Sequence, residues 1–273
     1  MIGRLESRLG YLMLTLGAVI ALLPVLGVLL LALNKSTTAT GGFPSISSLH
    51  PSNLGHVWTE AAFGPAMKAS AIITLATVAI SLVVSIPAGY AFATMSFRGR
   101  GLLFYLLLLG LLVPLEAVVI PLYFDLRHFG LVDNYWGVVL PDSALSVAFG
   151  SFWMRAFFLS TPRSLVEAAR LDGVGAFETL VRVLLPLARP HILTMAVLVF
   201  VWTWNDFLLP LVMLSGSTIQ TAPISLVFFQ SQHTTDIVGL AGAAVLTAAP
   251  VIAVYVLLQR NFTRGMLAGA VKG

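Results

Sequence analysis

The chain has 273 residues, no cysteine and a formal net charge of +4, and 58% of its residues are hydrophobic. Only 10% are charged, against about 25% in a typical soluble domain. So few charged residues cannot cover so much apolar surface, which excludes an ordinary soluble enzyme, a disordered chain and a disulfide-stabilised secreted domain. The absence of cysteine also excludes thiol chemistry and cysteine-ligated metals. A polytopic membrane protein remains.

Charge-poor apolar runs predict six membrane-spanning helices, because a helix needs about 20 apolar residues to cross a bilayer. The predicted spans are residues 9–33, 69–96, 101–124, 135–158, 190–214 and 237–259. These runs are too long and continuous for the strands of a transmembrane barrel, and the first is too long for a cleavable signal peptide. Asp142 lies inside the fourth run, so five helices are the alternative. We expect an all-α polytopic membrane protein in which residues 1–273 form a single transmembrane domain.

The basic residues predict that the N- and C-termini are both cytoplasmic. In this orientation twelve Lys and Arg residues lie inside, and only Lys35, Lys68 and Arg127 lie outside, in agreement with the positive-inside rule. The count supports the fourth span, since without it residues 155–189 and the C-terminal tail would lie on opposite sides. The pI of about 9.7 therefore reflects membrane topology rather than nucleic-acid binding.

The cytoplasmic loop at residues 160–189 has the pattern of a helix–turn–helix. Thr161 can cap a first helix, and Gly173 is suited to its end. A second short helix is expected from Phe177 to Leu185, ended by Pro186. This segment is too polar to span a membrane and too regular to be a linker.

Three motifs carry a resemblance to a known family. Glu167-Ala168-Ala169, Gly173, Val183 and Leu185-Pro186 fit the spacing EAA-x3-G-x9-[IV]-x-LP. This spacing is the signature loop of ABC importer permeases. Trp204-Asn-Asp-Phe-Leu-Leu-Pro210-Leu is similar to the WN-[DE]-F-x-x-PL element of carbohydrate permeases, and residues 259–273 resemble the terminal QR-x-F-x-x-G-x-x-x-GAVKG of the maltose-transporter G-type subunit. The resemblance covers essentially the whole chain and is weakest over residues 1–65.

The resemblance implies the permease subunit of an ATP-driven importer that translocates a sugar or oligosaccharide across a prokaryotic inner or plasma membrane. It implies four kinds of partner: the lipid bilayer, a second homologous permease subunit, two cytoplasmic ATPase subunits and an extracytoplasmic sugar-binding protein. We expect no catalytic residue, cofactor or metal ligand in this chain and no nucleic-acid partner. ATP and Mg are expected in the partner ATPase subunits, since the sequence contains no Walker A motif.

The resemblance also implies that the first loop helix docks on an ATPase subunit and transmits its closure to the spans. The expected coupling residues are Glu167, Ala168, Ala169, Arg170, Asp172, Gly173, Leu185 and Pro186. The small side chains of Ala168, Ala169 and Gly173 let a partner surface approach closely, and the carboxylate of Glu167 can pair with a partner arginine. The alternative use of Glu167 is a capping box with Ser164, in which the carboxylate binds the backbone at the helix start.

Two further segments are expected to contact partners. The basic, glycine-containing tail from residue 261 is expected to be flexible, and the resemblance implies that it reaches the ATPase subunits through Gly269, Lys272 and Gly273. The outer loop at residues 215–236 has no Lys or Arg, and the resemblance implies that it contacts the binding protein. In each case a solvated segment without a partner is the alternative.

Polar residues in the spans are candidates for a sugar route. These are Glu116, Asn205, Asp206 and Trp204. By helix rise, Glu116 and Asp206 lie in the outer half of the membrane, and a buried charge there normally faces a cavity or a partner. A structural role at the outer ends of the spans is the alternative, and the resemblance implies that the partner permease can hold most of the sugar site.

Two other functions are compatible with the composition. Import of glycerol phosphate by the same scaffold would favour Lys or Arg in the outer half of the spans, where the sequence has none. A self-contained secondary transporter would need a coupling-ion constellation. Glu116, Asp142 and Asp206 are isolated acidic residues, with no Lys, Arg or His beside them in the spans to complete one.

Overall fold

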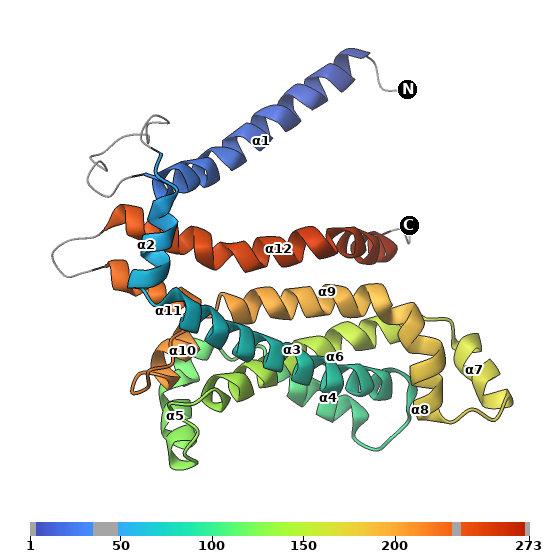
Figure 1. Ribbon diagram of the computed structural model, residues 1–273. Helices are drawn as coiled ribbons and strands as arrows, with labels where there is room; N and C mark the ends of the chain where they lie inside the picture. Colours follow the sequence, from blue (N-terminus) through green and yellow to red (C-terminus); the bar gives the residue numbers. More distant parts are fainter. Residues whose placement is uncertain (1–3, 35–48, 231–235, 271–273) are drawn as a thin grey trace. The chain divides into compact units, whose positions relative to one another are not determined.

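The computed structural model describes residues 4–34, 49–230 and 236–270, and this part of the chain is almost entirely helical (Figure 1). The expected all-α class is confirmed: among the described residues, the strand-like pairing is one isolated bridge between Asn34 and Leu49. The elements are α1 (Arg4–Ala32), α2 (Ser52–Glu60), α3 (Phe63–Thr94), α4 (Arg100–Leu109), α5 (Leu115–His128), α6 (Trp136–Ser160), α7 (Arg163–Leu171), α8 (Ala176–Glu178), the π-helix η3 (Thr179–Leu184), α9 (Leu185–Trp204), α10 (Leu208–Met213), α11 (Ala222–Ser225), the 3-10 helix η4 (Leu226–Phe229) and α12 (Ile237–Ala270).

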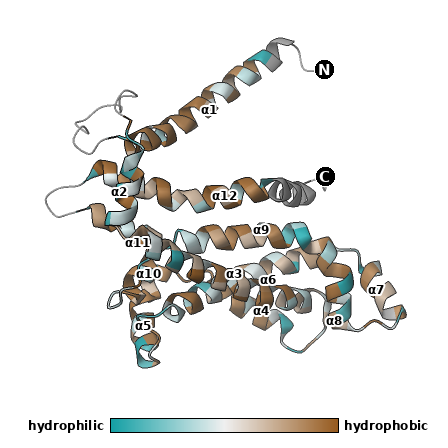
Figure 2. Cartoon of the chain, viewed as in Figure 1, coloured by the Kyte–Doolittle hydropathy of each residue, from teal (hydrophilic) through white to brown (hydrophobic). Residues whose placement is uncertain are grey.

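Five of the described helical stretches are long and apolar enough to cross a membrane, at residues 8–32, 63–94, 136–160, 176–204 and 237–259. Figure 2 shows hydrophobic residues along most of their length. The continuous third span expected at residues 101–124 is instead divided into α4 and α5. The two helices are separated at residues 110–114 because Pro114, in an extended conformation, has no N–H to continue the helix.

The fifth span also differs from the expectation of residues 190–214. The helix runs without a break from Ala176 to Trp204, so Pro186 does not end a short helix. Pro186 lies in the first turn of α9, where its missing N–H is tolerated, and the wide π turn of η3 directly precedes it. The helix stops at Asn205, and α10 follows as a separate short helix.

The chain divides into two compact units, residues 65–221 with 250–273 and residues 1–64 with 222–249. Two apolar cores lie in the described part of the larger unit. One packs α3, α6, η3 and α9 together around Tyr90, Met154, Phe158, Leu184 and Met195. Glycine allows the close crossing of α3 and α6, because a Cβ at Gly89 would lie only 2.6 Å from the Cβ of Met154.

The second core of the larger unit joins the short helices to the long ones. It contains Ile73 of α3, Val119 of α5, Val138 of α6 and the two α10 residues Leu209 and Met213, all of which are buried. Burial of these side chains holds α5 and α10 against α3 and α6. The packing therefore positions both interruptions of the spans, at residues 110–114 and 205–207.

The smaller unit contains α1, α2, α11, η4 and the first part of α12. Asn53 of α2 donates a hydrogen bond from Nδ2 to the carbonyl of Ala32, 2.7 Å away. Asp236 caps α12 by accepting hydrogen bonds from the N–H groups of Val238 and Gly239 at 3.1 and 3.0 Å. Residues 8–26 of α1 are exposed throughout, so their apolar surface is available to lipid or to a partner.

The C-terminal segment differs from the flexible strand that the sequence predicted. Helix α12 continues to Ala270, because Leu, Met, Arg and Ala between residues 259 and 270 favour a helix despite two glycines. Gly269 thus lies in the last turn of α12. Lys272 and Gly273 lie outside the described residues.

Candidate functional site

The segment expected to couple to an ATPase is formed by α7 and the turn that follows it. Gly173 has φ +77°, a left-handed conformation that only glycine adopts without strain. The N–H of Asp172 donates to the carbonyl of Ala168 at 3.0 Å, and that of Val174 donates to Ala169 at 2.9 Å. Gly173 therefore ends α7 as the sequence predicted, with the helix carbonyls satisfied.

The start of α7 differs from the predicted caps. The hydroxyl of Thr161 donates to the carbonyl of Phe157 in α6 at 3.1 Å. Helix α7 begins at Arg163, so Ser164 lies inside its first turn and is not the cap residue that a capping box requires. Glu167 is exposed. Its side chain is therefore available to a partner.

The expected coupling residues divide between an outer and an inner face. Glu167, Ala168, Asp172 and Pro186 are exposed, whereas Ala169 is buried and Leu185 packs against the core of α3, α6 and α9. The side chain of Arg170 lies outside the described residues. The structure thus assigns an inward packing position to Ala169 and Leu185 and an outward position to Glu167, Ala168, Asp172 and Pro186.

Two large apolar side chains of this segment were not among the predicted coupling residues. Leu171 is 89% exposed and Phe177 is 78% exposed, on either side of the turn at Gly173. Apolar side chains at the tip of a polar segment are typical of a contact surface. The sequence contained a signal, since both are large apolar residues that flank the predicted turn at Gly173.

A polar pocket of about 310 Å³ lies beside α7. It is lined by Glu167 and Arg163 of α7 together with Arg100 of α4 and Thr161. Arg100 donates a hydrogen bond to the carbonyl of Met95 at 2.9 Å. The coupling segment is therefore bordered by a cavity with both acidic and basic groups.

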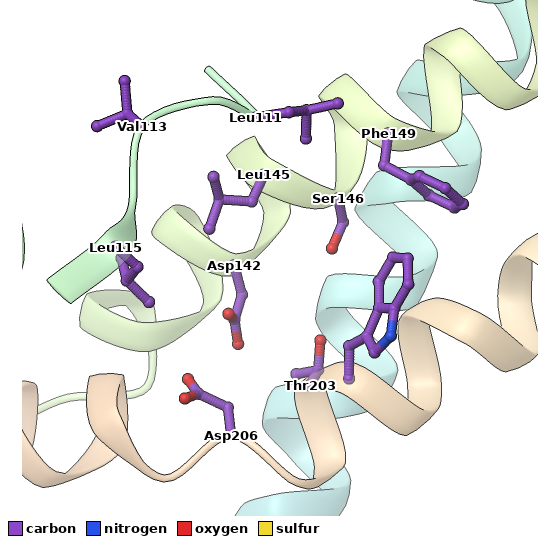
Figure 3. A pocket seen from close by; sticks show the side chains of 10 residues that line it. Leu111, Val113, Leu115, Asp142, Leu145, Ser146, Phe149, Thr203 and Asp206 are labelled. Atoms are coloured by element: carbon purple, nitrogen blue, oxygen red, sulfur yellow. The ribbon is translucent and has the colours of Figure 1, made fainter. Parts of the chain in front are cut away.

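The larger unit contains a second cavity of about 390 Å³ between α6, the end of α9 and the link from α4 to α5 (Figure 3). Its lining residues are Leu111, Val113, Leu115, Asp142, Leu145, Ser146, Phe149, Trp202, Thr203 and Asp206. The carboxyl groups of Asp142 and Asp206 point toward one another across it. We call this space the polar cavity.

The carboxyl groups of the polar cavity are incompletely hydrogen-bonded. The side chain of Asp142 is buried, with 9% of the residue exposed. Asp206 accepts a hydrogen bond at Oδ1 from the N–H of Leu208 at 3.1 Å. The Oδ2 atoms of both residues are buried without a hydrogen-bond partner among the described residues. These two oxygens can accept hydrogen bonds from a ligand.

Aromatic rings form one wall of the polar cavity. The rings of Phe149 and Trp202 meet edge to face with centroids 4.7 Å apart. The hydroxyl-bearing residues Ser146 and Thr203 lie beside them. Acceptor groups next to apolar ring faces suit a molecule that has hydroxyl donors and a flat apolar face.

The structure brings only one of the four predicted route residues to the polar cavity, namely Asp206. Trp204 is buried and stacks on Phe200 at a centroid distance of 5.6 Å. Asn205 donates to the carbonyl of Val201 at 2.7 Å, and Glu116 is exposed in the first turn of α5. None of these three lines the cavity, since each faces another side of its element.

Three residues that line the polar cavity were not among the predicted site residues, although their spacing in the sequence places them on one helix face. Asp142, Ser146 and Phe149 recur at helical spacing and therefore share one face of α6. Trp202 lies two residues before Trp204, on another face of α9. Across the described residues no group of three or more His, Asp or Glu side chains could hold a metal ion.

Comparison with known proteins identifies the family. The model of the family "binding-protein-dependent transport system inner membrane component" matches residues 85–268. The chain belongs to this family. It is therefore a multi-pass inner membrane component of a transport system and not an enzyme.

Similarity to individual permeases extends over nearly the whole chain. The arabinooligosaccharides transport system permease protein AraQ of Halalkalibacterium halodurans is 33% identical, with 94% of this chain and 93% of that protein covered. The trehalose transport system permease protein SugB of Mycobacterium tuberculosis is 33% identical, with 93% of each covered. A crystal structure of a bacterial ABC transporter involved in alginate import contains a chain with the same fold, with a TM-score of 0.79 and 23% sequence identity. The match covers 96% of this chain and 99% of that chain.

Proposed function

We propose that this permease translocates a sugar or oligosaccharide as one membrane subunit of an ATP-driven importer. The observation that carries the proposal is similarity to two sugar-system permeases over more than nine tenths of the chain. The polar cavity supports it, because carboxylates, hydroxyls and aromatic rings are groups that bind sugars. In this proposal residues 1–273 act as one permease domain with both termini in the cytoplasm.

The proposed complex contains a second homologous permease, two ATPase subunits and an extracytoplasmic binding protein. ATP and Mg bind in the ATPase subunits, and this chain contributes no cofactor site. The surface formed by Glu167, Ala168, Leu171 and Phe177 contacts an ATPase subunit. Its support is the exposure of these four residues around the turn at Gly173. The end of α12 with Lys272 and Gly273 provides a further contact, and the outer loop at residues 215–236 contacts the binding protein.

Glycerol phosphate is a less favourable cargo for this permease. A phosphate ligand requires cationic or N–H donor groups. The polar cavity has two carboxyl groups and no Lys, Arg or His in its lining. The charge of the cavity therefore favours a sugar over a phosphate ester.

The test is purification of the complex from membranes through an affinity tag on this permease. We expect an ATPase, a second permease and a binding protein to copurify or to be required for activity. Calorimetry of the binding protein with trehalose, arabinooligosaccharides and glycerol phosphate identifies the cargo class, and the ligand found should stimulate ATP hydrolysis by the complex in lipid. A complex without an ATPase, or one stimulated only by glycerol phosphate, would contradict the proposal.

A further inference from the structure

The polar cavity is unbalanced in charge. Of its lining residues, Asp142 and Asp206 are acidic and none is basic. The Asp142 residue is nine-tenths buried and aims its carboxyl group into the cavity, where Oδ2 has no partner among the described residues (Figure 3). A buried carboxyl oxygen without a donor is costly in a membrane protein, so a ligand or water is expected to supply one.

The C-terminal end of α9 adds to this negative character. Trp202 and Thr203 belong to the last turn of α9, where the carbonyl groups give a helix its negative pole. Leu111 and Val113, from the interruption between α4 and α5 at residues 110–114, line another wall together with Leu115 at the start of α5. Interrupted helices border the substrate sites of many transporters, because unwound backbone is tolerated in a membrane only where it lines a cavity or is buried in protein.

We propose that the polar cavity is a water-accessible station on the sugar route that admits uncharged and amine-bearing saccharides and excludes acidic ones. This inference rests on the proposed function and adds the charge class of the cargo. Hydroxyl or ammonium groups donate hydrogen bonds to Oδ2 of Asp142 and Asp206, and a sugar face lies against Trp202. A uronate carboxylate meets two carboxyl groups and a helix C-terminus, with no cation to compensate its charge.

The absence of cysteine from the chain makes a direct test simple. Ser146→Cys places one thiol in the polar cavity of the tagged permease, expressed with its partners in membranes. The thiol is then exposed separately to a cationic trimethylammonium-ethyl and an anionic sulfonatoethyl methanethiosulfonate, and the modification rate of the tagged chain is measured with each. Ser160→Cys, exposed at the end of the same helix, gives the reference ratio of the two rates for a thiol in water.

We expect both reagents to modify Ser146→Cys, with a cationic-to-anionic rate ratio at least about 10-fold above the Ser160→Cys reference. Adding Asp142→Asn should lower the ratio toward that reference. Phe152→Cys, at a half-exposed position of α6 that lines a neighbouring apolar pocket with α4, should react slowly with both reagents. Thr203→Cys supplies a second cavity position in case Ser146→Cys does not reach the membrane.

Two results would overturn the inference. Ratios equal to the Ser160→Cys reference at both cavity positions would show that the acidic groups exclude no anions. If neither reagent modified Ser146→Cys or Thr203→Cys in the assembled complex, the cavity would be closed to water. The labelling requires no knowledge of the cargo, whereas the proposed function is tested by sugar-stimulated ATP hydrolysis, so the two can fail separately.

Discussion

The carboxylate of Asp133 accepts a hydrogen bond at Oδ1 from the N–H of Gly216 at 2.8 Å, across 83 residues of sequence. The N–H of Asp133 also donates to the carbonyl of Met213 at 2.8 Å. Asp133 has φ +63°, a left-handed conformation that Asp and Asn tolerate better than most residues. This residue therefore ties the segment before α6 to the end of α10.

Asp133→Ala should lower the thermal stability of the permease in detergent. The variant loses a charge-assisted hydrogen bond and places alanine in a left-handed conformation. Together these changes should lower the free energy of unfolding by about 2–3 kcal/mol. Asp133→Asn retains an acceptor oxygen and tolerates the same φ. We therefore expect it to lower the free energy of unfolding by less than about 1 kcal/mol. Asp125→Ala, at an exposed position on α5, is the matched control. Equal melting temperatures for Asp133→Ala and Asp125→Ala would contradict this interpretation.

The turn that ends α7 permits a test of backbone conformation alone. A Cβ at Gly173 would meet no atom of the described chain within 4 Å, yet the residue has φ +77°. Gly173→Ala should therefore cost about 1 kcal/mol in backbone strain and reduce ATPase copurification by about 5-fold.

Gly175→Ala is the matched control, because Gly175 has φ −68° and equal space around it. The Gly175→Ala permease should copurify with the ATPase as the wild type does. Gly173→Leu should be more severe than Gly173→Ala, since a bulky side chain also obstructs a docked ATPase. Wild-type copurification and transport by Gly173→Leu would refute the coupling role of this turn.

The exposed apolar residues of the coupling segment should contribute to ATPase binding. Replacing Leu171 or Phe177 with Asp removes apolar surface that becomes buried on docking, and should lower copurification of the ATPase by about 10-fold, or about 1.4 kcal/mol. Membrane insertion should be unchanged, because both side chains are already exposed. Phe129→Asp is the control, since Phe129 is 73% exposed at the end of α5. A similar loss in that control would indicate general misfolding.

Deletion of residues 268–273 should leave insertion and complex assembly largely intact but reduce transport-coupled ATP hydrolysis. Topology does not depend on Lys272, since all of the other inner cations remain. The measurement is sugar-stimulated ATPase activity of the purified complex in lipid, with Lys272→Ala as a milder comparison. Equal stimulation of the truncated and full-length complexes would mean that this segment makes no functional contact.

The local sequence was sufficient to predict where most helices form and what kind of protein they build. Apolar runs of about 20 residues indicate membrane helices because a helix of that length crosses the bilayer with its backbone hydrogen bonds satisfied internally, whereas barrel strands are shorter and alternate. Gly173 could be predicted to end α7, since a left-handed turn there requires only properties of that residue. Pro114 and Pro186 show the limit of such rules: the first separates α4 from α5, while the second continues a helix after a π turn.

The set of residues that encloses the polar cavity was decided by the tertiary structure. Asp142 and Asp206 are 64 residues apart, and they face one another only because α6 packs against α9 in one core and against α10 in the other. Likewise Trp202 lines the cavity and Trp204 does not, although both are tryptophans of the same helical turn. Residues two apart on a helix point about 200° apart, so the choice between them rests on which face of α9 meets α6. Sequence periodicity identifies such faces, but the packing of neighbouring helices decides which of them encloses a cavity.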